Sequence, residues 1–433
     1  MKGVTKMKAK LLKNGLLIDG TGNDVKNAVD VLIEGNKITA IGTDLSVPHT
    51  YSPEQVDIIE LNGKTIMPGM VEAHTHFTWQ DSLYIQDIDF KPLEETMIGA
   101  ILNAETMLKS GFTSCVSAAA RGRVDIALRD AINRGQIPGP RMLANGAEVS
   151  ATGSFVDLHP NHVRVHGLSF LADGEDEVRK VVRSLFKEGA DLVKVNVSGE
   201  SLTAHATGEM TLYTYKEVRA AVEEAHARGK RVYVHARTSD SVKICVKAGV
   251  DIIGHADFID DEAFDMLVHE KDRLFVVPGL NWLVSTLEHG ADYFGQEALD
   301  ATGYKEGLQI ALKNMNRLYK AGVRVLPGGD YGFKWCPHGG YARDLEHFVK
   351  LVGMTPMDAI VTATKYGSQI MQMEDKIGTI EVGKLADILV VDGNPLENIA
   401  VLQDHDKLNL ILKDGEYIVR TLEISSEVAS AAV

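Results

Sequence analysis

Short apolar runs alternate with longer segments of helical spacing through the middle of the chain. The intervening segments include residues 177–190 and 215–230, whose apolar side chains recur at intervals of three and four. Eight such runs favour a closed (β/α)8 TIM barrel over an open doubly wound sheet. The predicted strands are residues 69–77, 111–119, 141–149, 191–199, 231–238, 251–258, 273–280 and 323–330.

The two ends of the chain have a different pattern. Short apolar runs near the N-terminus are separated by Asn-Gly, Asp-Gly and Gly-Asn, which predicts hairpins of an antiparallel sheet. Residues 377–393 and 408–420 repeat this pattern. We therefore predict a small β-sandwich domain formed by both termini (1–67 and 377–433) around a barrel domain (68–376).

Composition and charge narrow the class of protein. The 433 residues suffice for one large barrel and a satellite module, and 45% hydrophobic with 24% charged residues is ordinary for a globular protein. The net charge of −15 argues against nucleic acid or anionic membranes as partners. No apolar run has the length of a signal peptide or a membrane span, so we expect a cytoplasmic protein. Cys115, Cys245 and Cys336 show no CxxC spacing and are interpreted as buried free thiols.

Potential metal ligands stand at the C-terminal ends of the predicted strands, where barrel enzymes carry their chemistry. His74 and His76 close the first run at i and i+2, so both imidazoles project from one face. His235, His255 and Asp330 close the fifth, sixth and eighth runs. An HxH pair or a strand-end Asp is weak evidence alone, but four imidazoles and a carboxylate together suit zinc and neighbouring divalent ions.

Lys194, in the fourth run, is the unusual member of this set. An ammonium group beside divalent cations would be repelled, so a lysine fits there only when it is neutral or modified. Its amine can add carbon dioxide to give a carbamate, whose two oxygens can bridge two metals. The alternative is a lysine that extends to solvent from the barrel rim.

The complete set resembles the amidohydrolase superfamily, whose members carry HxH after strand one, a carboxylated Lys or a Glu after strand four, His after strands five and six, and Asp after strand eight. LLIDGTG, NGKTIMPGMVEAHTHF and GTIEVGKLADILVVDGNPLENI are also similar to segments of such enzymes, so the likeness covers nearly the whole chain. Within the superfamily, the chain resembles the branch of imidazolonepropionase-like proteins, Xaa-Pro dipeptidases and ochratoxin-type amidohydrolases, and also the phenylurea hydrolases.

The resemblance implies a binuclear metal-dependent hydrolase that cleaves a C–N bond of an amide, urea or carbamate, of the aryl amide or N-acyl amino acid type. Two divalent ions, with zinc as the expected metal, would be held by His74, His76 and Asp330, by His235 and His255, and by carboxylated Lys194 between them. The ions lower the pKa of a bridging water from about 15.7 towards about 7, and the resulting hydroxide attacks the substrate. Asp330 would move the proton to the leaving nitrogen, and the expected catalytic residues are Asp330, Lys194 and His255.

Substrate contacts are expected in the loops after the strands. Dipeptidase relatives tend to carry Gly-Gly-His-Gly-Asp after strand three, whereas Ser154 and Phe155 stand there in this chain, which weakens a peptidase assignment. Arg237 either pairs with a substrate carboxylate or forms a salt bridge at the rim. Phe155, Trp282 and Trp335 either line the site with aromatic rings or pack in the core.

Four histidines remain outside the predicted metal set. His338 is expected near the barrel mouth. His159, His162 and His166 fit no familiar metal spacing, and they predict either a loop with substrate contacts or solvated side chains.

Two other functions remain open. One is an Xaa-Pro-type dipeptidase or carboxypeptidase, and the other is a non-catalytic structural barrel, which the presence of all six ligands disfavours. We expect a small-molecule substrate and a homo-oligomer.

Overall fold

The computed structural model describes residues 8–163, 165, 167–201, 203 and 205–424, so His166 lies outside the described residues. The chain divides into two compact units. Unit 1 comprises Met1–Val71, Leu108–Thr113 and Thr355–Val433, and unit 2 comprises Glu72–Met107 and Ser114–Met354. All six predicted metal ligands fall within unit 2.

Unit 1 is built on one eight-stranded mixed sheet to which both ends of the chain contribute. The predicted antiparallel hairpins are present, because β1 pairs with β2, β2 with β3, β15 with β16 and β16 with β17 in antiparallel register. In addition, β1 pairs in parallel with β4 and β5, so that all these strands belong to one sheet. Its apolar core includes Leu12, Ile66 and Val390. The strands run β17 (Glu416–Arg420), β16 (Leu408–Lys413), β15 (Ile388–Val391), β5 (Thr65–Pro68), β1 (Ala9–Leu17), β2 (Lys26–Glu34) and β3 (Lys37–Gly42) across the sheet, with β4 (Val56–Glu60) also on β1.

Among the described residues, the strands of the predicted barrel are paired in two sheets. The alternation of these strands with helices is an α/β fold of the kind typical of a TIM barrel. The pairings within the six-stranded sheet are parallel, as is the pairing of β7 with β8. One sheet contains β6 (Met70–Thr75), β7 (Phe112–Ser117) and β8 (Arg141–Leu143), and the other contains β10 (Ser169–Leu171), β9 (Glu148–Ser150), β11 (Leu192–Asn196), β12 (Arg231–Thr238), β13 (Ile252–Phe258) and β14 (Phe275–Val277).

Two strand predictions are wrong. Residues 141–149 do not form one strand but supply β8 and part of β9. Residues 323–330 contain only an isolated bridge from Val325 to Val276, because the segment continues into Pro-Gly-Gly, which lacks one N–H donor and weakens a strand. Backbone hydrogen bonds nevertheless join this segment to its neighbours, from Leu326 N to Val276 O (2.9 Å), from Val276 N to Arg324 O (2.9 Å) and from Ala73 N to Pro327 O (3.0 Å).

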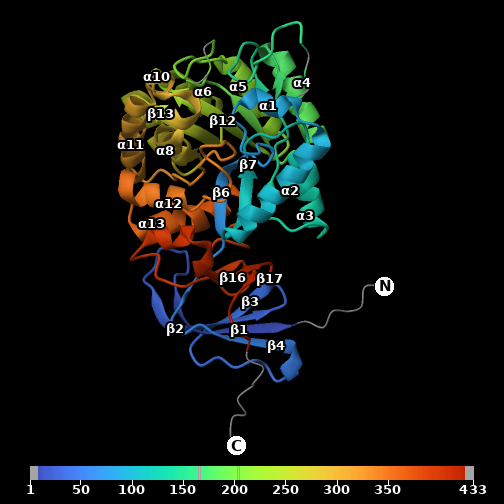
Figure 1. The fold of residues 1–433 in the computed structure, drawn as a ribbon, viewed down its shortest axis with the longest axis vertical. Helices are drawn as coiled ribbons and strands as arrows, with labels where there is room; N and C mark the ends of the chain where they lie inside the picture. The colour runs from blue at the N-terminus through green and yellow to red at the C-terminus, as the bar shows by residue number, and fades with distance from the viewer. Residues whose placement is uncertain (1–7, 164, 166, 202, 204, 425–433) are drawn as a thin grey trace, which may run out of the picture. The chain divides into compact units, whose positions relative to one another are not determined.

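Amphipathic helices alternate with these strands (Figure 1). Helix α4 (Gly174–Lys187) buries Val178, Val182 and Leu185, and helix α5 (Tyr215–His226) begins at a Thr214–Glu217 capping box. In the described part of the chain, no helix combines the length and apolar character needed to cross a membrane. The other α-helices are α1 (Ile85–Phe90), α2 (Leu93–Lys109), α3 (Val124–Asn133), α6 (Ser239–Ala248), α7 (Asp261–His269), α8 (Leu280–His289), α9 (Ala291–Phe294), α10 (Gln296–Asp300), α11 (Tyr304–Lys320), α12 (Arg343–His347), α13 (Pro356–Val361) and α14 (Gly367–Ile370).

Short helical turns complete the fold. They are the 3-10 turns η1 (Pro53–Gln55), η4 (Ile399–Gln403) and η5 (His405–Lys407), and the π turns η2 (Phe348–Val352) and η3 (Thr362–Tyr366).

Candidate metal centre and substrate cavity

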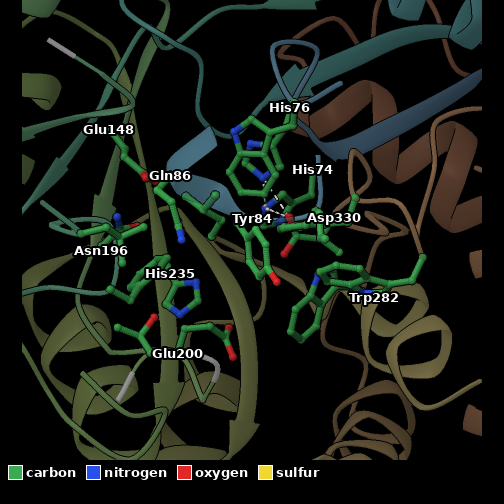
Figure 2. A pocket seen from close by; sticks show the side chains of 18 of the residues that line it. His74, His76, Tyr84, Gln86, Glu148, Asn196, Glu200, His235, Trp282 and Asp330 are labelled. Atoms are coloured by element: carbon green, nitrogen blue, oxygen red, sulfur yellow. Dashed lines mark hydrogen bonds and ion pairs between the residues drawn. The ribbon is translucent and has the colours of Figure 1, made fainter. Parts of the chain in front are cut away.

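The end of strand β6 brings two imidazoles against one carboxylate. The Nε2 atoms of His74 and His76 are 3.1 Å apart. Asp330 Oδ1 lies 2.9 Å from His76 Nε2 and 3.5 Å from His74 Nε2, and Figure 2 shows these three side chains pointing toward one another. The approach requires a glycine at Gly328, since a Cβ there would lie 2.7 Å from His74 Cβ. The three groups can therefore act on one cation.

Hydrogen bonds on the far side of the rings orient three of the histidines. His76 Nδ1 lies 3.1 Å from the Ala119 carbonyl oxygen, and His235 Nε2 lies 3.1 Å from the Gly199 carbonyl oxygen. His74 Nδ1 lies 2.9 Å from the Tyr233 hydroxyl. Metal-binding histidines commonly hydrogen-bond through the nitrogen that does not bind the ion, so each ring keeps one nitrogen for a ligand.

His255 is the strongest sign that a cation belongs at this site. Its side chain is buried, and neither ring nitrogen has a hydrogen-bond partner among the residues that the structure describes. Its ring centroid is 4.4 Å from that of His235 and 5.5 Å from that of His74. One ligand atom each from His74, His255 and Asp330 lies within 4.8 Å of the others. A buried imidazole without partners is costly, and a metal ion would satisfy it.

The protonation states also fit a cation. Burial lowers the pKa values of His74, His235 and His255 well below the usual value, so the rings are neutral and can bind a metal. Backbone conformation adds a constraint, because His255 (φ 74°) and Asp330 (φ 58°) lie in the left-handed region that side chains other than Gly rarely adopt.

Lys194 lies within the same group of side chains. It is buried on β11, and its Nζ is 4.2 Å from the ring centroid of Tyr233. Burial lowers the pKa of Lys194 to about 8, although the Glu148 carboxylate acts to raise it. A fraction of the amine is therefore neutral at neutral pH, which is the form that adds carbon dioxide.

A cavity of about 430 Å³ opens beside these ligands. Five of the six predicted ligands line it, and His255 is not among the lining residues. Phe155, Trp282 and Trp335 also line the cavity, which is one of the two alternatives that the sequence left open for them. Polar lining residues outside the predicted site include Glu148, Asn196 and Glu200. Figure 2 shows Glu148 and Asn196 on the opposite side of the cavity from Trp282.

Three residues proposed from the sequence as substrate contacts do not line the cavity. Arg237 is buried beside the site and pairs with the carboxylates of Glu200 and Asp257. His159 Nε2 lies 2.9 Å from Asp89 Oδ2.

His338 is similarly occupied. Its Nδ1 lies 2.8 Å from the Tyr341 hydroxyl, and its Nε2 lies 2.8 Å from the Trp79 carbonyl oxygen. Burial lowers the pKa of His338 to about 4, so this side chain is a neutral structural group.

A family model described as the amidohydrolase family matches residues 65–418, most of the chain. The chain belongs to the amidohydrolase family. Its membership confirms the resemblance seen in the sequence and makes the chain a hydrolase of C–N bonds, in a family that generally uses divalent metal ions.

Named relatives span almost all of the chain. An ochratoxinase of Aspergillus niger is 27% identical, over 94% of this chain and 86% of that protein. The crystal structure of a Xaa-Pro dipeptidase with bound methionine is 32% identical with a TM-score of 0.83, and it covers 95% of this chain and 99% of that chain. Phenylurea hydrolase B shares the fold, with a TM-score of 0.75 at 19% identity over 95% of this chain and 96% of that chain.

Proposed function

We propose that the chain is a binuclear metal-dependent amidohydrolase that cleaves an amide, urea or carbamate of the aryl amide or N-acyl amino acid type. The observation that carries this proposal is the buried His255 imidazole, whose two nitrogens lack partners among the described residues beside three further imidazoles and Asp330. A cation accounts for this arrangement, because the His255 ring is otherwise desolvated with no hydrogen bond among the described residues in return.

We assign the ligands in two groups, following the geometry and the family. His74, His76 and Asp330 would hold one divalent ion, and His235 and His255 the other. Lys194, as its carbamate, would be shared, and zinc is the metal we expect. When bound, the ions supply a water of lowered pKa as nucleophile and polarise the substrate carbonyl.

The side chains supply the remaining chemistry. Asp330 Oδ1 lies beside His76 and His74, where it can accept the proton of the attacking water and deliver it to the leaving nitrogen. The neutral amine of Lys194 adds to carbon dioxide, releases one proton and becomes an anion with two oxygens. Tyr233 holds the His74 ring through Nδ1 and thereby keeps Nε2 directed at the centre.

Metal analysis of purified variants tests the proposal. We expect about two ions per chain in the wild type and clearly fewer in His255→Asn, with hydrolysis of anilides or carbamates lost in parallel. His269→Asn is the matched control, because His269 is exposed on α7. Removal of metal with a chelator should abolish hydrolysis, and added zinc should restore it. Unchanged metal content in His255→Asn would contradict the assignment.

A second candidate is an Xaa-Pro-type dipeptidase or carboxypeptidase, which the similarity to the Xaa-Pro dipeptidase structure favours. The two candidates differ in whether the substrate must carry a free carboxylate. A homo-oligomer, a cytoplasmic location, full closure of the barrel and the domain boundaries at residues 67 and 376 stay predictions.

A further inference from the structure

One wall of the cavity is a continuous aromatic surface. We call it the aromatic wall, and its members are Trp79, Trp282, Phe294, Phe333 and Trp335. Phe333 is stacked on Trp335 with 4.8 Å between ring centroids and meets Trp79 edge to face at 5.0 Å. Phe294 packs edge to face on Trp335 at 4.7 Å. Because the rings hold one another in place, the wall presents a preformed apolar face to a ligand.

Few charged side chains line the cavity. Besides Asp330 of the proposed metal centre, the carboxyl groups of Glu148 and Glu200 line it, and Lys194 is the one Lys or Arg side chain among its described lining residues. Lys194 belongs to the proposed metal centre, where it would become an anion on carboxylation. Away from the proposed metal centre, a substrate carboxylate would therefore meet no Lys or Arg side chain among the described lining residues, and it would lie near the carboxyl groups of Glu148 and Glu200, which opposes its binding.

The guanidinium group nearest the site is already neutralised. Arg237 donates from Nε to Glu200 Oε2 at 2.9 Å and pairs through Nη1 with Asp257 Oδ2. Glu200 Oε1 also accepts hydrogen bonds from the Tyr304 hydroxyl (2.7 Å) and the Ser201 N–H (2.8 Å), so this carboxylate is held firmly against Arg237. Arg237 is 2% exposed, and its two carboxylates must be displaced before it can contact a substrate.

We propose that this cavity selects an aromatic substrate without a free carboxylate, and that the Glu200–Arg237–Asp257 cluster enforces this choice by withholding the guanidinium group. The proposal rests on the proposed function and deepens it. It names uncharged aryl amides, ureas or carbamates as the substrate class, and it disfavours N-acyl amino acids and dipeptides.

A matched pair of anilides tests the selection. The probes are 4-acetamidobenzamide and 4-acetamidobenzoate, which share the scissile bond and nearly the same shape but differ in charge. All three tryptophans of the chain line the cavity, so quenching of intrinsic fluorescence reports binding to the metal-loaded protein whether or not hydrolysis follows. We expect the neutral amide to bind at least about tenfold more tightly, the factor that corresponds to ~1.4 kcal/mol.

The outcomes separate this inference from the proposed function. If neither anilide is hydrolysed but the neutral one binds preferentially, the selection stands and the assigned chemistry fails. Equal or tighter binding of the carboxylate overturns the selection, and so does the absence of binding by both probes.

Variants of one loop test the role of the charge cluster. Glu200→Gln removes a negative charge from the lining of the cavity and weakens one ion pair of Arg237. We therefore expect the preference for the neutral anilide to fall by about threefold or more. Glu209→Gln removes the same charge from an exposed position in the same loop and should keep the wild-type preference. An unchanged preference in folded Glu200→Gln protein would contradict the role of the cluster.

Discussion

Arg237→Met is the most informative single change in this protein, because it separates a buried structural charge from a substrate contact. In the wild type, Arg237, Glu200 and Asp257 are 2%, 6% and 1% exposed. The change leaves two carboxylates buried without their guanidinium partner, and breaking a buried ion pair in this way costs about 3–5 kcal/mol. We expect a loss near ~3 kcal/mol, because Glu200 keeps its bonds from Tyr304 and Ser201.

A double-mutant cycle identifies the partner. Asp257→Asn leaves Arg237 paired with Glu200, so we expect it to cost only about 1–2 kcal/mol. The double variant should lose about 1–3 kcal/mol less stability than the sum of the losses of the two single variants, because the two residues are in contact.

Urea unfolding followed by tryptophan fluorescence measures these losses. Trp79, Trp282 and Trp335 all belong to unit 2, so the signal reports the unit that contains Arg237. Arg183→Met is the control, since Arg183 pairs with Glu224 from an exposed position and its removal should leave the unfolding midpoint close to that of the wild type. A loss below ~1 kcal/mol for Arg237→Met, with an increase in KM confined to carboxylate substrates, would refute the reasoning.

Three further changes test the centre and its support. Asp330→Asn should retain metal by elemental analysis but lose turnover of any anilide or carbamate substrate by about 100-fold or more, and full activity would exclude proton transfer by Asp330. Lys194→Ala should lose metal and recover part of its activity when short carboxylates are added, so unchanged metal content would count against a bridging role. Burial raises the pKa of Asp344 to about 6. Between about pH 4 and pH 6 the folded protein therefore keeps a proton on Asp344 that the unfolded chain has released. The free energy of unfolding falls as the pH rises through this range. Metal-free wild type should therefore lose about 1 kcal/mol more than Asp344→Asn between about pH 5 and pH 7.5 in urea unfolding.

The sequence carried enough information for the class of fold and for the converging ligands. His74 and His76 stand two residues apart at the end of an apolar run, and this is a local feature of the sequence. The spacing of apolar residues within α4 and within α5 is local as well. The pairing of the eighth predicted strand could not be read from the sequence, because Pro327 and two glycines interrupt it. Only the structure shows which backbone groups of this segment are paired.

The substrate cavity was less accessible to sequence reasoning. Glu148 lies in a run that reads as a half-buried strand, and nothing in one sequence marks it as facing Lys194. The environment of Arg237 depends on Glu200, which follows β11, and on Asp257, which lies in β13. Only the structure therefore shows that Arg237 forms salt bridges instead of contacting the cavity.

The left-handed backbone at His255 and Asp330 has a consequence for how the protein tolerates heat. Each such residue costs about 1–2 kcal/mol relative to a regular conformation, and the neighbouring Ala256 (φ 58°) adds another. Bound cations would offset this cost by mass action, whereas the metal-free chain bears it in full. The melting temperature should therefore depend on the concentration of divalent ions in the medium.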